Sequence, residues 1–94
     1  MRLSVQPTDL VELCEHVAAV HWSKARSRHL QLRLALDPAL PALMELDPHR
    51  VQQVLHNLLS NAIKFSERGE VVLWARRQGE WIVCGVDDEG PGIS

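Results

Sequence analysis

The chain has 94 residues, of which 46% are hydrophobic and 23% are charged, and its net charge is −2. These values are typical of one soluble globular domain or part of one, and they exclude a disordered segment. Because basic and acidic residues are spread evenly along the sequence, neither half has the excess of positive charge needed to coat nucleic acid or an anionic membrane.

The sequence also predicts a cytoplasmic location for this chain, with membrane anchoring of the parent protein through segments outside it left open as an alternative. No apolar run is long enough to span a bilayer, and the N-terminal residues contain no apolar signal-peptide segment. Cys14 and Cys84 lie far apart in the sequence, each on the apolar stripe of its predicted element. We expect both to be reduced core residues.

The first part of the chain predicts a helix followed by a strand. Asp9 followed by Glu12 has the pattern of a helix N-cap, and apolar residues then recur at helical spacing over residues 9–28. The helix ends in three basic residues, Lys24, Arg26 and Arg28. We interpret them as a solvated face rather than as an anion site. Leucines alternate over residues 30–36, which predicts a strand with one buried face.

A short extended piece at residues 44–46 precedes a second predicted helix over residues 48–65, for which Asp47 is the expected N-cap and Pro48 the first helical residue. Its predicted core face is an apolar stripe: Val51, Val54, Leu55, Leu58, Leu59 and Ala62. Gly69 is the expected terminator of this helix.

Two strands at residues 70–77 and 81–88 surround a tight turn, which predicts an antiparallel hairpin. The predicted order is therefore helix, strand, short strand, helix and hairpin. This order indicates an α+β fold, a two-layer α/β sandwich in which one sheet lies under two helices.

Asn57, Asn61 and Lys64 interrupt the apolar second helix at steps of four and three, which places them along one edge of it. A buried polar side chain without a partner costs about 1–3 kcal/mol, so three in register suggest a ligand. An amide oxygen suits Mg²⁺, and an ammonium group suits a polyphosphate. The alternative is a polar helix edge at the margin of the sheet.

The segment "DDEGPGIS" is a second candidate for a ligand site. Strand alternation places Asp88 in line with the predicted buried apolar row, where a carboxylate is costly unless it accepts a hydrogen bond. The exocyclic amine of adenine is a suitable donor. Gly90 and Gly92 would let the backbone turn sharply and approach a ligand closely. The alternative is a Gly-Pro turn that follows a strand with an acidic cap.

Taken together, "NLLSNAIKFS", the hairpin and "DDEGPGI" resemble the N box and the G1 box of the sensor histidine kinase ATP-binding domain, in the superfamily that also contains gyrase, HSP90 and MutL. The segments "VQPTDLVELCEHV" and "LDPHRVQQVLHNLLSNAIKFS" resemble the opening of that domain. The resemblance implies a Bergerat-type ATP-binding fold over residues 1–94, incomplete at the C-terminus, with the N box at 57–65 and the G1 box at 88–92.

The resemblance also implies the roles of seven residues in binding ATP and Mg²⁺: Asn57, Asn61, Lys64, Phe65, Asp88, Gly90 and Gly92. Asn61 would ligate Mg²⁺, Asn57 would support the metal and phosphate region, and Lys64 would contact phosphates. Phe65 would flank the base or sugar. Asp88 would accept a hydrogen bond from the adenine amino group, and the two glycines would form the floor beside the adenine.

Gyrase-like relatives carry a catalytic glutamate where this chain has Asn57, and an amide cannot act as a general base toward water. The chain therefore resembles the kinase branch, whose members phosphorylate a histidine and pass the phosphoryl group to a response-regulator aspartate. None of the five histidines precedes an acidic residue, so we expect the phosphoacceptor domain to be absent from this chain. We also expect the lid, the second glycine-rich box and the last helix and strand of the domain to be absent from it.

From this resemblance we expect the fragment alone to be inactive. An uncovered sheet edge would favour self-association, for instance as a homodimer. The alternative function is a non-catalytic dimerisation or interaction module, or a nucleotide sensor, of the same fold.

Overall fold

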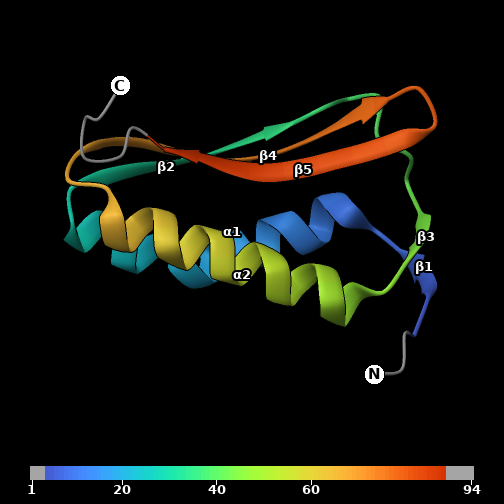
Figure 1. Cartoon of the computed structure of the whole chain (residues 1–94), viewed down its shortest axis with the longest axis horizontal. Helices are drawn as coiled ribbons and strands as arrows, with labels where there is room; N and C mark the ends of the chain where they lie inside the picture. Colours follow the sequence, from blue (N-terminus) through green and yellow to red (C-terminus); the bar gives the residue numbers. More distant parts are fainter. Residues whose placement is uncertain (1–3, 89–94) are drawn as a thin grey trace.

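The structure is a computed structural model and describes residues 4–88 (Figure 1). The predicted ligand residues Gly90 and Gly92 lie outside the described residues. The elements follow in the order β1 (Gln6–Thr8), α1 (Leu10–Ser27), β2 (Leu30–Leu36), β3 (Met44–Leu46), α2 (Pro48–Phe65), β4 (Gly69–Gln78) and β5 (Trp81–Asp88).

Figure 1 shows two layers, with α1 and α2 side by side on one face of a sheet. The strand order of this sheet is β2-β4-β5, in which β2 and β4 are parallel and β4 and β5 are antiparallel. Helix α1 packs against β2 and α2, whereas α2 also packs against β4 and β5. This arrangement confirms the predicted α+β fold, the two-layer sandwich and the hairpin.

A second, two-stranded sheet was not predicted from the sequence. Strand β1 pairs with β3 in an antiparallel register that joins Gln6 to Leu46. The two strands lie beside the N-terminal ends of both helices (Figure 1). This small sheet anchors the segment that leads into α1 to the segment that leads into α2.

Side-chain caps fix the starts of both helices, as predicted. Asp9 Oδ1 accepts a hydrogen bond of 3.0 Å from the backbone N–H of Glu12, and Asp47 Oδ1 accepts one of 3.2 Å from Arg50. The end of α2 differs from the prediction, because Ser66 caps it through a 3.0 Å bond from its N–H to the Ala62 carbonyl. Gly69 instead opens β4.

The core fills the space between the helices and the inner face of the sheet. Its largest fully buried apolar side chains come from both helices and from β4: Leu10, Val17, Leu55, Leu59, Ile63, Val71 and Leu73. The predicted burial of Val54 and Leu58 is wrong, since 50% and 42% of their surfaces are exposed. Helix α2 is covered on one side only, so residues at the flank of its apolar stripe face outward, and Ile63 is buried instead.

The cysteines occupy the predicted core. Cys14 is fully buried on α1, and Cys84 on β5 is half-buried against the same core. Both are free thiols. Burial raises the pKa of the Cys14 thiol to about 11, and proximity to Cys84 adds to the shift.

Candidate functional site

The N-box residues predicted to bind the nucleotide lie on the solvent side of α2. Asn57, Asn61 and Lys64 are all exposed, and 60% of the surface of Phe65 is exposed. The expectation that the two asparagines and the lysine are buried is therefore wrong. The reason is that α2 buries the opposite face, which carries Leu59, so water can satisfy the polar groups. Asn57 and Asn61 nevertheless present two exposed amide groups one helical turn apart.

Lys64 contacts the Phe65 ring and lines a groove beside α1. Its Nζ lies 5.3 Å from the centroid of the Phe65 ring, a cation–π contact that is worth about 0.5–1 kcal/mol at an exposed site. Lys64 also lines a groove between α2 and α1, which neither asparagine does. Of the three polar residues Asn57, Asn61 and Lys64, the lysine is therefore the one that lies beside α1.

Asp88 lies at the end of β5 on the face of the sheet that the helices cover. It pairs with the buried residue Val71, whereas its neighbour Asp87 pairs with Val72 and faces the other side. The predicted face is correct, but the carboxylate is exposed rather than buried. The strand ends at this residue, so no described neighbour covers the side chain.

The structure therefore places the two halves of the predicted site on adjacent elements. Asn57, Asn61 and Phe65 lie on the exposed face of α2, and Asp88 lies on the same side of the sheet, on the strand against which α2 packs. Gly90 and Gly92 are outside the described residues. Within residues 4–88, three or more His, Cys, Asp or Glu side chains do not gather into a possible metal site.

Two histidines form a contact between the helices that was not predicted from the sequence. Nε2 of His21 on α1 and Nδ1 of His56 on α2 share a hydrogen bond of 2.9 Å, and their ring centroids are 5.1 Å apart. Burial, followed by the proximity of His56, lowers the pKa of His21. The position of His21 on the apolar stripe of its helix indicated helix packing, but nothing in the sequence pointed to this partner.

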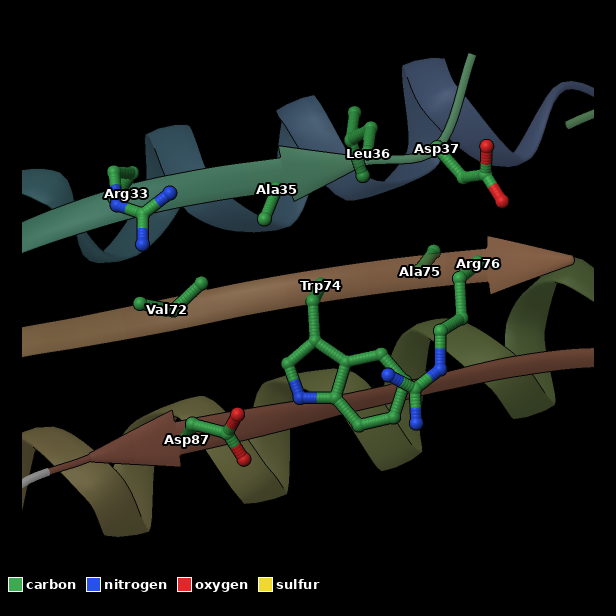
Figure 2. A pocket seen from close by; sticks show the side chains of 9 residues that line it. All are labelled: Arg33, Ala35, Leu36, Asp37, Val72, Trp74, Ala75, Arg76 and Asp87. Carbon is green, nitrogen blue, oxygen red and sulfur yellow. The ribbon is translucent and has the colours of Figure 1, made fainter. Parts of the chain in front are cut away.

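The outer face of the sheet carries a separate pocket of about 630 Å³ (Figure 2). The Arg76 guanidinium lies 4.7 Å from the centroid of the Trp74 ring, and Figure 2 shows Asp87 on the other side of the indole. Because this face is opposite the helices, the pocket is not part of the site formed by α2 and Asp88. No pattern in the sequence predicts this pocket.

Neither helix of the described part is long and apolar enough to cross a membrane.

Comparison with known proteins identifies the family. Residues 46–94 match the family described as histidine kinase-, DNA gyrase B- and HSP90-like ATPase. The sensor histidine kinase RcsC of Escherichia coli strain K12 is 36% identical over 94 residues, a match that covers 98% of this chain and 10% of RcsC. The alginate biosynthesis sensor protein KinB of Pseudomonas aeruginosa is 38% identical over 93 residues, covering 98% of this chain and 16% of KinB.

The fold is also that of solved histidine kinases. The full-length ShkA structure in complex with AMPPNP superposes with a TM-score of 0.91 at 32% identity, covering all of this chain and 20% of ShkA. AdeS of Acinetobacter baumannii gives a TM-score of 0.84 at 26% identity and covers all of this chain and 46% of AdeS. The chain spans about a tenth of the length of RcsC and about a sixth of that of KinB. The chain belongs to the histidine kinase-, DNA gyrase B- and HSP90-like ATPase family.

Proposed function

We propose that the chain is the N-terminal part of the ATP-binding domain of a sensor histidine kinase. The observation that carries this proposal is the placement of Asn57 and Asn61 on the exposed face of α2, with Asp88 at the end of the adjacent strand on the same side of the sheet. The two asparagines suit the metal and phosphate end of a nucleotide, and the Asp88 carboxylate suits the adenine end. The parent protein would transfer the γ-phosphate of ATP to a histidine and then to a response-regulator aspartate.

The donor set fits Mg²⁺ bound together with phosphates rather than a bare ion. Magnesium usually keeps several waters and substrate oxygens in its octahedral shell, so the amide oxygen of Asn61 can serve as one protein ligand, supported by Asn57. When bound, Mg²⁺ would neutralise phosphate charge during in-line transfer. Lys64 would place a further positive charge near the phosphates, and Phe65 would flank the sugar or base.

Asn57 also determines what the site does not do. An amide has no basic lone pair with which to take a proton from water, so this residue does not activate a hydrolytic water. The site would therefore hold the γ-phosphate for an acceptor supplied by another domain. We expect that acceptor domain, the response regulator and the nucleotide to be the partners of the parent protein, in the cytoplasm.

A second candidate function rests on the exposed apolar residues of α2. Val54, Leu58 and Phe65 are all more than 40% exposed and flank the asparagines. A face of this kind is typical of a surface that packs against more protein. The alternative function is therefore a non-catalytic dimerisation or interaction module of the same fold, or a nucleotide sensor.

The test is a calorimetric titration of the 94-residue chain with Mg-ADP. We expect saturable binding that requires Mg²⁺ and that Asp88→Asn weakens about tenfold or more, since an amide no longer offers a charged acceptor to the adenine amine. Asp87→Asn is the matched control because its side chain lies on the opposite face of the same strand. Equal weakening by both substitutions, or no binding by folded protein, would favour the interaction module.

A further inference from the structure

A groove of about 280 Å³ lies between the C-terminal turns of the two helices. Its lining residues come from α1 with its C-cap Arg28 and from α2: His21, Lys24, Arg28, Ser60, Ile63 and Lys64. The groove is on the side of α2 that faces α1. Asn57 and Asn61 do not line it, so the groove does not include the two residues proposed for the Mg²⁺ end of the nucleotide site.

The groove concentrates positive charge without an acidic residue in its lining. Lys24, Arg28 and Lys64 project from facing helices, and in the part of the chain that the structure describes neither lysine forms a salt bridge. The C-terminal end of each helix contributes roughly −0.5 of an elementary charge, which offsets about one of the three cationic charges. An excess of about two positive charges therefore remains in a small concave space.

Two of these cationic side chains are already held in position. Arg28 Nη2 donates a 3.0 Å hydrogen bond to the Ser66 carbonyl, which ties the end of α1 to the end of α2 and leaves further guanidinium N–H groups available. Lys64 lies against the Phe65 ring. Such anchoring lowers the entropy cost of binding an anion, because fewer rotamers are lost.

Ser60, His21 and Ile63 complete the lining. The Ser60 hydroxyl is exposed on α2 within the groove, and His21 borders it while its Nε2 is hydrogen-bonded to His56. The volume is below the range of about 300–1,000 Å³ that is usual for pockets that hold drug-sized ligands. The space is therefore large enough for one or two phosphoryl groups.

We propose that this groove binds a compact phosphoryl anion, such as inorganic phosphate or pyrophosphate, through Lys24, Arg28, Ser60 and Lys64. The inference revises the interpretation of the basic tail of α1 as a solvated face only. Arg26 lies outside the groove, where that interpretation holds. The groove shares Lys64 with the proposed nucleotide site, but the α1 residues belong to the groove alone.

The experiment is a titration of the isotope-labelled 94-residue chain with magnesium-free pyrophosphate, followed by NMR through the imidazole signals of His21 and His56. We expect saturable shifts that Lys24→Gln weakens about tenfold, since a charge-assisted hydrogen bond is lost. Arg26→Gln is the matched control, with the same loss of charge on the same helix, and we expect less than a twofold effect. Circular dichroism verifies that both variants are folded.

If both substitutions weakened pyrophosphate binding equally, the effect would come from the overall charge of the protein and not from the groove. That result would overturn the proposal, as would the absence of saturable shifts. Vesicles that contain phosphatidylglycerol test for a lipid head group as the source of the phosphoryl anion. Vesicle binding that Lys24→Gln abolishes, together with no response to pyrophosphate, would overturn the assignment to a free anion.

Mg-ADP separates this proposal from the proposed function. Lys24→Gln is expected to weaken pyrophosphate binding and to leave Mg-ADP binding unchanged, whereas Asp88→Asn is expected to weaken Mg-ADP binding and to leave pyrophosphate binding unchanged. If Lys24→Gln weakened the binding of pyrophosphate and of Mg-ADP equally, the groove would be part of the nucleotide site. That result would overturn the proposal of a separate anion site.

Discussion

The indole ring of Trp74 covers the backbone of Gly85 on the neighbouring strand, so closely that a β-carbon at Gly85 would lie 2.9 Å from Cζ2 of Trp74. The two residues are direct partners in the β4–β5 register. Glycine is required here because a larger residue would displace the ring, on whose face the Arg76 guanidinium rests. The absence of a side chain at Gly85 therefore lets the Trp74 ring lie flat over β5 on the outer face of the sheet.

Gly85→Ala is expected to destabilise the protein by about 1–3 kcal/mol, the usual cost of overpacking, measured as the free energy of unfolding in urea. The control is the same substitution in a Trp74→Leu background, where the clashing ring is gone and the cost should shrink. A cost of the same size in both backgrounds would contradict the role assigned to the indole.

Adjacent leucines on α2 test the observed position of the core. Leu59 is completely buried, whereas 42% of Leu58 is exposed. Leu59→Ala should lower the free energy of unfolding by about 2–5 kcal/mol through lost burial and a residual cavity, and Leu58→Ala by about 0.5 kcal/mol. Chemical denaturation of both variants measures the difference. Similar losses would mean that α2 is rotated relative to the structure.

The contact between His21 and His56 predicts a pH dependence of stability. The pKa of His21 in the folded protein is lowered from 6.5, so between the two pKa values the unfolded chain binds more protons than the folded one. The contribution of His21 to stability should therefore be complete above about pH 6.5. The free energy of unfolding should decrease as the pH falls from there through the pKa of His21 in the folded protein. Burial of the His21 imidazole is the main cause of this lowered pKa, and the proximity of His56 adds to it.

His21→Gln should flatten this dependence, whereas His16→Gln, an exposed position on the same helix, should leave it intact. The measurement is a series of urea denaturations between pH 5 and 8. An unchanged slope in His21→Gln would assign the effect to another group.

Burial of Cys14 predicts that its thiol is unreactive. With the side chain inaccessible and the pKa raised to about 11, almost no thiolate is available at pH 8. N-ethylmaleimide should therefore label Cys14 far more slowly in the folded protein than in urea, as measured by mass spectrometry of peptides. Labelling at the same rate in both conditions would show that α1 is not packed as described.

The parts of the fold that depend on neighbouring residues were predictable from the sequence. Asp9 and Asp47 mark the helix starts because a cap acts within a single turn, and the turn at Gly79 joins two strands that are adjacent in the chain. The pairing of Gln6 with Leu46 was not predictable, because short strands far apart in sequence carry no local signal for each other. The same reason applies to the contact between His21 and His56.

The candidate site was predictable in its residue types but not in its burial. Helical periodicity correctly places Asn57 and Asn61 on one edge of α2, but it does not indicate which flank of the apolar stripe the sheet covers. Val54 and the asparagines are consequently exposed rather than buried. Strand alternation likewise gives the face on which Asp88 lies, while the end of the strand determines its exposure.

The most direct test of the proposed function is to map Mg-ADP onto the isotope-labelled 94-residue chain by amide chemical shifts. The proposal predicts that the largest shifts fall within residues 57–65 of α2 and at Asp88, with little change on the outer face of the sheet. Shifts centred on Trp74 and Arg76 instead, or no saturable shifts in folded protein, would contradict the nucleotide site proposed here.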